Sequence, residues 1–279
     1  MKVVVTGGAG LLGAELARTV PAGWRVEVTV HRTPAADGVR AHHVDLAQPL
    51  AAFELFERRR PDLVIHTAYS KTDHADTVDS ATEVAAACAA LDIALIHIST
   101  DALFDGDHAP YDESASPSPI HPYGRAKALA EVAVLDAVPD ATIVRTSLIL
   151  AADGTDSTSA WAIERLRAGE RVTFFDDEFR SPILVDDLAA QIWEIAALDP
   201  DERLGVWHLV GPERLSRLDV GRRLCGRFGL DESLIDVASA ASMGEPRPRD
   251  LMLSSERVSR LTLRARPIGS LGAHGETNR

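Results

Sequence analysis

Three glycines near the N-terminus restrict this chain more than any other feature of its sequence. Gly7, Gly10 and Gly13 follow an apolar run, Lys2–Val5, and open a segment with helical periodicity, Leu11–Val20. Glycines between a strand and a helix let the chain turn sharply, let a ligand approach the backbone amides, and let the helix pack closely on the strand. Because a helix N-terminus attracts anions, this arrangement is typical of a turn that binds the pyrophosphate of a dinucleotide.

The first half of the chain alternates β-branched runs with longer helical stretches, which is the pattern of a parallel sheet covered by helices on both faces. The expected strands are Lys2–Val5, Arg25–Val30, Ala41–Val44, Leu63–Thr67, Ala94–Ser99 and Thr142–Arg145. The expected helices are Leu11–Val20, Phe53–Arg59, Ala81–Leu91 and Tyr123–Leu135. We therefore expect an α/β protein with a Rossmann doubly wound parallel sheet.

The second half is less regular and predicts a small C-terminal substrate lobe. Its expected elements are helices at Ser159–Ala168, Asp186–Ala197 and Arg217–Phe228 and strands at Arg171–Phe174 and Gly205–Val210, followed by the segment Glu245–Arg249. We predict a dinucleotide-binding domain at 1–150, to which 185–210 returns, and a substrate-binding lobe at 151–184 and 211–268. The polar stretch 269–279 is expected to be a flexible tail.

Composition argues against several classes of protein. The formal net charge of −13 disfavours binding to nucleic acid or to an anionic membrane. The two cysteines, Cys88 and Cys225, lie far apart and are expected to be packed thiols, and the histidines lack metal-ligand spacing. The first residues run directly into a predicted strand, without a charged leader or a long apolar span. We expect a cytoplasmic protein without a metal.

Tyr123 and Lys127 lie four residues apart at the start of a predicted helix, so both side chains emerge on one face. The chain has three tyrosines and three lysines, and chance would produce only about 0.03 such pairs. A nearby ammonium lowers the pKa of a phenol, and a more acidic tyrosine can donate its proton to a carbonyl oxygen. The pair therefore predicts Tyr123 as a general acid with Lys127 as its partner.

A second hydrogen-bond donor is expected at the end of the strand Ala94–Ser99. Ligands collect at the carboxyl ends of parallel strands, and Thr100 follows this strand directly. We assign Thr100 as the donor that orients the carbonyl and offsets its developing charge. The alternative is a threonine that only bonds the local backbone.

The residues after the second predicted strand bear on the choice of cofactor. NAD-binding proteins of this fold place an acidic residue there to accept the ribose 2′-hydroxyl, whereas this chain has His31 and Arg32. A guanidinium suits the 2′-phosphate of NADP, although an arginine in a loop can simply be solvated. We expect NADP as the preferred cofactor, with NAD as the alternative.

Five segments, "TGGAGLLG", "STDALFDG", "PIHPYGRAKALAE", "VRTSLIL" and "DDEFRSPILVDDLA", together resemble the dTDP-4-dehydrorhamnose reductase group of extended short-chain dehydrogenases, over Met1 to about Leu263. The resemblance implies NAD(P)H-dependent reduction of a keto group on a nucleotide-linked sugar. It implies that Thr100 and Asp101 contact the sugar, while Tyr123 and Lys127 transfer the proton and hold the cofactor. The cofactor contacts that it implies are Gly7, Gly10, Leu11, Leu12, Gly13, His31, Arg32, Asp45, Leu46, Ala68, Tyr69, Ser70, Tyr123 and Lys127.

Several positions on the substrate side depart from the pattern of the group. Leu148 replaces a tryptophan, His121 replaces an asparagine, and no asparagine stands near Thr77. The group's Asp-Gln-x-Gly-x-Pro-Thr is here Asp177–Ile183, with an arginine, Arg180, at its fourth position. Arg180 is expected to contact a phosphate or carboxylate of the substrate, or else to form a structural salt bridge.

Three rival functions share these features. A sugar-nucleotide dehydratase would need a glutamate after the Thr-Asp pair, where this chain has Ala102. An epimerase needs little beyond the same threonine, tyrosine and lysine, so it stays open. A non-catalytic NADP-binding subunit, like the regulatory subunit of methionine adenosyltransferase, would not need the proton-transfer residues. Helices of this kind often pair subunits in the family, so a homodimer is also expected.

Overall fold

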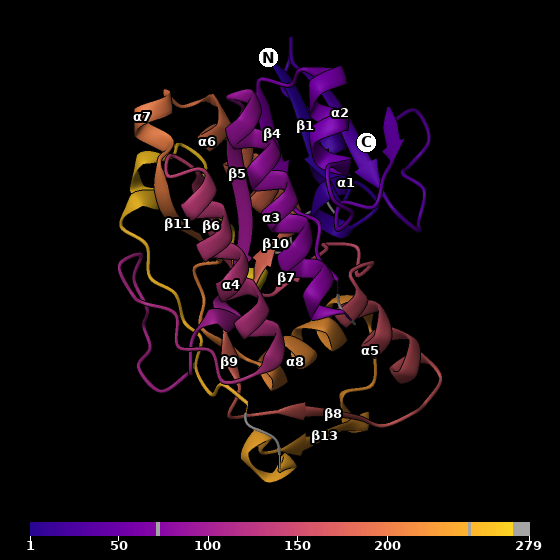
Figure 1. Cartoon of the computed structure of the whole chain (residues 1–279). Helices are drawn as coiled ribbons and strands as arrows, with labels where there is room; N and C mark the ends of the chain where they lie inside the picture. The colour runs from indigo at the N-terminus through magenta and orange to yellow at the C-terminus, as the bar shows by residue number, and fades with distance from the viewer. Residues whose placement is uncertain (71–72, 245–246, 270–279) are drawn as a thin grey trace.

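The computed structural model describes residues 1–70, 73–244 and 247–269, and a parallel sheet lies at its centre (Figure 1). The order across the sheet is β3-β2-β1-β4-β5-β6-β11, and each neighbouring pair is parallel. This order confirms the expected doubly wound α/β fold. The strands are β1 (Lys2–Thr6), β2 (Arg25–Val30), β3 (Ala41–His43), β4 (Leu63–His66), β5 (Ala94–Thr100), β6 (Thr142–Thr146) and β11 (Gly205–Leu209).

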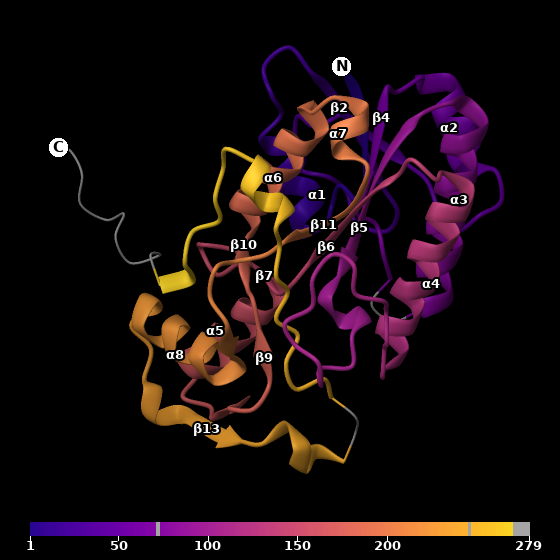
Figure 2. The same cartoon turned by 90° about the vertical axis from the view of Figure 1, so that its left-hand side faces the viewer.

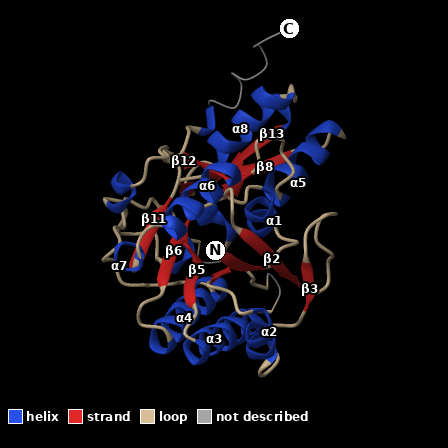
Figure 3. Ribbon diagram, turned by 90° about the horizontal axis from the view of Figure 1, so that it is seen from above, coloured by secondary structure: helices blue, strands red, loops and turns tan. Residues whose placement is uncertain are grey.

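Helices cover both faces of the sheet (Figure 3). One face carries α2 (Ala51–Arg59), α3 (His74–Leu91) and α4 (Pro122–Ala137), and the other carries α1 (Leu11–Arg18) and α6 (Val185–Ala197). Val3 and Val5 pack toward α1 and α6, whereas Val4 packs toward α2 and α3. A central strand buried on both faces requires such a continuous apolar run.

Most of the rest of the chain forms a smaller lobe beside the carboxyl ends of the strands (Figure 2), whereas the short helix Pro200–Arg203 lies at the other end of the sheet, just before β11. The lobe's own core includes Leu166, Phe174 and Leu224. A capping box between Ser216 and Asp219 starts its longest helix. The elements of this half are β7 (Ile149–Leu150), α5 (Ser157–Arg167), β8 (Val172–Phe175), β9 (Phe179–Arg180), β10 (Ile183–Leu184), α7 (Pro200–Arg203), β12 (Leu215–Ser216), α8 (Arg217–Phe228) and β13 (Ile235–Ala238).

Two expectations about the elements were wrong. Helix α3 begins at His74, seven residues before the expected Ala81, because the Asp73 carboxylate caps the amides of Ala75 and Asp76. Strand β13 was not expected at all; it pairs in parallel with β8. The short strands β7, β9, β10 and β12 and the four-residue helix α7 were also missed, while the other predicted bounds lie within two residues of the observed ones.

Two predicted features reach beyond the part of the chain that the structure describes. Residues 270–279 of the expected tail lie outside it, as do residues 245–246 of the Glu245–Arg249 segment. Among the helices within the described ranges, none has both the length and the apolar character needed to span a bilayer.

Candidate active site

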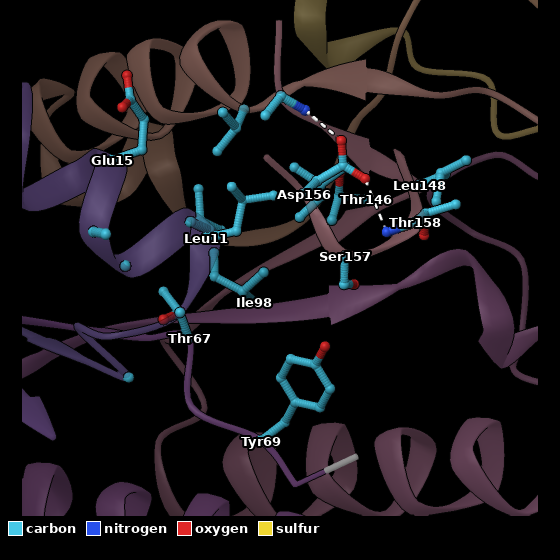
Figure 4. A pocket seen from close by; sticks show the side chains of 18 of the residues that line it. Leu11, Glu15, Thr67, Tyr69, Ile98, Thr146, Leu148, Asp156, Ser157 and Thr158 are labelled. Atoms are coloured by element: carbon cyan, nitrogen blue, oxygen red, sulfur yellow. Dashed lines mark hydrogen bonds between the residues drawn. The ribbon is translucent and has the colours of Figure 1, made fainter. Parts of the chain in front are cut away.

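A cavity of about 1520 Å³ opens where the carboxyl ends of the strands meet the smaller lobe. Figure 4 shows Leu11 and Thr67 on one side of it and Asp156, Ser157 and Thr158 of the lobe on the other. Pockets for one drug-sized ligand are usually about 300–1,000 Å³. This cavity is therefore large enough for a dinucleotide and a second molecule.

The glycine turn forms one wall of the cavity. Gly7 has a left-handed backbone (φ +69°), and its carbonyl accepts a hydrogen bond from the Gly10 amide at 2.9 Å. A Cβ on Gly13 would stand 2.3 Å from the Gly7 carbonyl oxygen, so α1 can approach the turn this closely only because position 13 is glycine. Gly10 is the N-cap of α1 and has no side chain to cap the first-turn amides. They stay available for a phosphate, so the turn fits a dinucleotide.

A buried hydroxyl fixes the two strand ends beside this turn. Thr6 Oγ1 accepts hydrogen bonds from the amides of Thr67 and Ala68, both at 3.1 Å. The hydroxyl group of Thr6 then donates its hydrogen to His66 Nδ1, which lies 2.8 Å away. Burial lowers the pKa of His66 to about 3, so the ring is neutral and can accept this bond. The ends of β1 and β4 are thus locked together at the cavity edge.

Lys127 lies under the floor of the cavity with 3% of its surface exposed. Its Nζ donates to the carbonyl oxygen of Ile98 at 2.7 Å and lies 3.4 Å from His97 Nε2. Burial lowers the pKa of Lys127 to about 8, and the carboxylate of Glu131 opposes this shift. With two partners beneath it, the ammonium has one N–H left for the cavity.

Tyr123 also lines the cavity, one helical turn from Lys127 on α4. The sequence predicts that Lys127 makes this tyrosine more acidic, and the structure contradicts that. Burial raises the pKa of Tyr123, Tyr69 raises it further, and Thr100 acts in the opposite direction. Burial is the largest cause of this shift, and the Lys127 ammonium, which donates to the Ile98 carbonyl, does not offset it.

Thr100 ends β5 and lines the same cavity. Its Oγ1 accepts a hydrogen bond from the Ala102 amide at 3.2 Å, so the local backbone bond considered above is present. Helix α4 packs directly on this turn, because a Cβ on Gly124 would lie 2.1 Å from the Ala102 carbonyl oxygen. That contact brings the start of α4, and with it Tyr123, to the end of β5.

Asp101 is held from two sides. Its Oδ2 accepts a hydrogen bond from Ser147 Oγ at 2.5 Å, and Arg180 Nε lies 3.7 Å from the same oxygen. Its Oδ1 accepts from Thr100 Oγ1 at 3.3 Å. Both Asp101 and Arg180 line the cavity, so the structure gathers the three predicted sugar contacts at one end of it.

The structure does not bring all the predicted cofactor contacts to the cavity wall. His31 and Arg32 are exposed, His31 Nε2 lies 3.9 Å from the Asp45 carboxylate, and the segment 36–39 lines the cavity near them instead. Leu46 is buried in the core between the sheet and α2. Neither Ala68 nor Ser70 is among the residues of the cavity wall.

Sequence reasoning missed several residues that line the cavity. Thr146 ends β6 and Ser147 follows it, and the rule that ligands collect at strand ends would have found them. Residues 155–158 at the start of α5 have only a helix-capping aspartate, Asp156, as their signal. Within the described residues, no group of three or more His, Cys, Asp or Glu side chains could hold a metal ion.

The comparison with known families decides what kind of chain this is. A family model described as the RmlD substrate binding domain matches residues 1–267. The chain belongs to this family. The match spans the sheet and the smaller lobe, so the whole described fold is that of an RmlD-type chain.

Named relatives are similar along nearly their whole length. The chain is 33% identical to the "Probable low-salt glycan biosynthesis reductase Agl14" of Haloferax volcanii, covering 92% of this chain and 91% of that one. It is 32% identical to the dTDP-4-keto-6-deoxy-D-glucose reductase of Streptomyces niveus, covering 91% and 88%. The crystal structure of dTDP-4-dehydrorhamnose reductase from Bacillus anthracis in complex with NADP has the same fold (TM-score 0.80, 21% identity, 95% of each chain).

The lowered pKa of Lys127 gives opposite pH trends for activity and stability. If the ammonium is needed, activity should fall about tenfold per pH unit well above pH 8. Stability should rise from about pH 8 toward 10.5, because the unfolded lysine binds a proton that the folded one has released. The neighbouring His66 and His97 stay neutral in this range, since burial lowers the pKa of both.

Rate profiles and denaturant unfolding from pH 7 to 10.5 check this prediction. Lys127→Met should lack the alkaline rise in stability, and a rise of equal size in that variant would assign the trend to another group.

Proposed function

We propose that this protein is an NAD(P)H-dependent reductase of a keto group on a nucleotide-linked sugar. The observation that carries the proposal is the convergence of Tyr123, Thr100 and Lys127 on one cavity that also contains the glycine turn. The 4-keto sugar named for the Streptomyces niveus relative makes C4 the most direct choice of carbonyl.

The cofactor would lie against the glycine turn, with its pyrophosphate at Gly10–Gly13 and its nicotinamide toward Tyr123. When bound, it supplies the hydride that reaches the carbonyl carbon. Lys127 would hold its ribose with the remaining N–H. Toward the adenine we propose Asp45, and beside the nicotinamide half we propose Tyr69, which lines the cavity. NADP is preferred in this proposal, since His31 and Arg32 offer positive charge to a 2′-phosphate.

The protein's own part in the reaction is to position the carbonyl and to supply a proton. Tyr123 donates a hydrogen bond to the carbonyl oxygen, which gains negative charge as the carbon is reduced, and the Thr100 hydroxyl would turn from Asp101 Oδ1 to donate a second one. Tyr123 then gives its proton to that oxygen, and an alcohol results. A phenol with an ordinary pKa of about 10 is protonated at neutral pH, as an acid must be before it acts, whereas the burial that raises the pKa of Tyr123 makes the proton harder to release. Asp101 and Arg180 would contact the sugar on the other side.

The rivals lack comparable support. Ala102 follows Asp101, so the glutamate of a dehydratase is missing, and a purely regulatory subunit has no need for three convergent proton-transfer residues. The names of both relatives above are those of reductases. An epimerase stays the nearest alternative, and it is distinguished because it consumes no reduced cofactor.

The direct test follows the absorbance of NADPH or NADH with a panel of 4-keto sugar nucleotides. Stoichiometric loss of NADPH with formation of the alcohol is expected. Tight NADPH binding without turnover of any panel member would contradict the reductase proposal, and interconversion of sugars without cofactor loss would identify an epimerase.

We also propose a cytoplasmic homodimer that pairs through α3 and α4. Leu129 and Val132 lie one turn apart on α4 and are 59% and 55% exposed, which is unusual for large apolar side chains. Sedimentation should give a dimer for the intact protein, and Leu129→Glu should give a monomer. A dimer that survives this substitution would place the interface elsewhere.

A further inference from the structure

His121 lines the cavity two residues before Tyr123, but the proposed reaction gives it no part. It is the N-cap of α4, and its Nδ1 accepts a hydrogen bond from the Gly124 amide at 3.0 Å. Its ring lies nearly parallel to the ring of Tyr123, with an interplanar angle of 13° and 6.2 Å between the centroids. His121 is therefore held in a fixed position beside the proposed proton donor.

The bond to the Gly124 amide decides which ring nitrogen of His121 carries the hydrogen. A nitrogen that accepts a hydrogen bond carries none, so in the neutral ring the hydrogen is on Nε2. Burial lowers the pKa of His121, Arg180 and Arg125 lower it further, and Asp101 acts in the opposite direction. The ring is therefore neutral at neutral pH, and Nε2 is a hydrogen-bond donor.

This donor has no partner inside the protein. No other described residue accepts a hydrogen bond from His121 Nε2. The two nitrogens of an imidazole point in different directions, so Nε2 points away from the helix amide that Nδ1 caps. Because His121 is half-buried and lines the cavity, this N–H is available to a molecule that binds there.

The cavity wall around Tyr123 has an aromatic side and a polar side. Strand β5, which ends at Thr100, lies between β4 and β6 in the sheet. Tyr69 follows β4, and Figure 4 shows its side chain extending into the cavity, with its ring 5.9 Å from that of Tyr123. Ser147 follows β6 and donates to Asp101 at 2.5 Å. A bound molecule would therefore meet an aromatic ring on the β4 side and polar groups on the β6 side.

His121 belongs to the polar side, because Asp101 and Arg180 are charges that act on its ring. Arg180 is already paired, with Glu178 at 3.1 Å and with Asp101 at 3.7 Å, so its charge is balanced within the protein. The polar side thus offers an N–H donor and a carboxylate acceptor without a surplus of charge. A hydroxyl group suits this combination, since it both accepts and donates hydrogen bonds.

We propose that His121 is a specificity-determining residue that donates a hydrogen bond from Nε2 to the C3 hydroxyl of the keto sugar. This inference rests on the proposed function and deepens it, because it names the substrate class as neutral 4-keto sugars with a hydroxyl on C3. In a 4-keto-6-deoxy pyranose, C4 is flanked by C3, which carries a hydroxyl, and by C5, which carries the methyl group. The hydroxyl would face His121 and Asp101, and the methyl group would face Tyr69.

Binding to the protein loaded with NADP⁺ tests the proposal, because the oxidised cofactor has no hydride to give and the keto sugar stays unreacted. The probes are dTDP-4-keto-6-deoxyglucose, its 3-deoxy analogue and dTDP alone, each titrated by calorimetry. The wild-type protein should bind the 3-hydroxy sugar about tenfold more tightly than the 3-deoxy sugar, since the analogue leaves the N–H unpaired.

Two variants of His121 separate sugar binding from helix capping. The short amide of H121N takes the place of Nδ1 and keeps the cap, whereas the longer amide of H121Q reaches the place of Nε2 and gives up the cap. H121N should lose the 3-hydroxy preference at an unchanged melting temperature. H121Q should retain part of the preference at a lower melting temperature. A residue that only caps the helix would give the reverse order.

H43N is the matched control, because His43 is exposed on β3 and does not line the cavity. It should bind all three probes as the wild type does. The affinity for dTDP alone should stay within about twofold in every variant, since this probe lacks the sugar.

Equal affinities of the wild type for the two sugars would overturn the inference, and so would a full 3-hydroxy preference in H121N. Reduction of both sugars by NADPH with equal kcat/KM would contradict the role of His121 and leave the proposed reductase standing. A preference that depends on His121 in the NADP⁺ complex, without turnover of either sugar by NADPH, would contradict the reductase proposal alone.

Discussion

Tyr123→Phe should lower kcat by about 10²–10⁴, because it removes the proton that the carbonyl oxygen receives and nothing else from the cavity wall. The affinity for NADPH should change little, since the ring and its contacts with Tyr69 and His121 remain. Single-turnover absorbance measurements give the rate, and fluorescence titration gives the affinity. A variant that keeps more than a tenth of the wild-type kcat would exclude Tyr123 as the acid.

Tyr111→Phe is the matched control for this substitution. The Tyr111 hydroxyl donates to Asp105 at 2.5 Å and accepts from the amides of Gly106 and His108, away from the cavity. Removing it should lower the melting temperature, because buried partners lose their bonds, while kcat of the folded protein stays at the wild-type value. Both substitutions remove one hydroxyl group. The loss at Tyr123 should therefore lower kcat, whereas the loss at Tyr111 should lower only the melting temperature.

Gly13→Val should abolish cofactor binding and destabilise the fold. A Cβ at this position would meet the Gly7 carbonyl oxygen at 2.3 Å, its carbonyl carbon at 2.8 Å and Gly8 Cα at 3.1 Å, all of them backbone atoms. Helix α1 would have to move away from the turn, which costs about 1–3 kcal/mol or more and displaces the amides that face the phosphates. NADPH affinity should fall at least 100-fold, as measured by titration calorimetry, and urea unfolding should shift to lower concentrations.

Gly226→Ala is the control for this substitution, and it should change the stability in the opposite direction. Gly226 lies inside α8, and a Cβ there would meet no heavy atom within 4 Å. Alanine should therefore stabilise the protein by about 0.5–1 kcal/mol and leave NADPH affinity unchanged. If Gly13→Val bound NADPH as tightly as Gly226→Ala, the glycine turn would not be the cofactor site.

Local periodicity was enough to predict the central sheet and the main helices. Strands such as β1 are buried on both faces, so their apolar runs are unmistakable, and the glycine turn fixes where the first helix begins. The first residue of α3 was not predicted, because the only sequence signal for it is a single capping side chain, Asp73. Strand β13 was not predicted, because it is only four residues long and its side chains are mostly half-exposed. It is stabilised as a strand by pairing with β8.

The chemistry of the site was predicted less completely than its residues. Sequence spacing places Tyr123 and Lys127 on one face of a helix, but the direction of the ammonium depends on the Ile98 carbonyl of another element. The balance of charge around Glu178 involves Arg247, 69 residues further along the chain. Contacts of that range leave no periodic trace in the sequence, so the environment of Arg180 could only be known from the folded chain.

The order of the strands has a consequence for how the protein is made. Strand β6 forms one inner position of the sheet only because β11 covers it, with Trp207 beside Val144, and residues 147–204 are translated between the two. Until β11 has left the ribosome, the growing chain carries a sheet whose last strand has unpaired amides and carbonyls, the kind of edge that recruits other chains. A fragment that stops after β6 would keep the backbone groups of that strand unpaired, and we expect it to aggregate more readily than the whole chain, in which β11 pairs with β6.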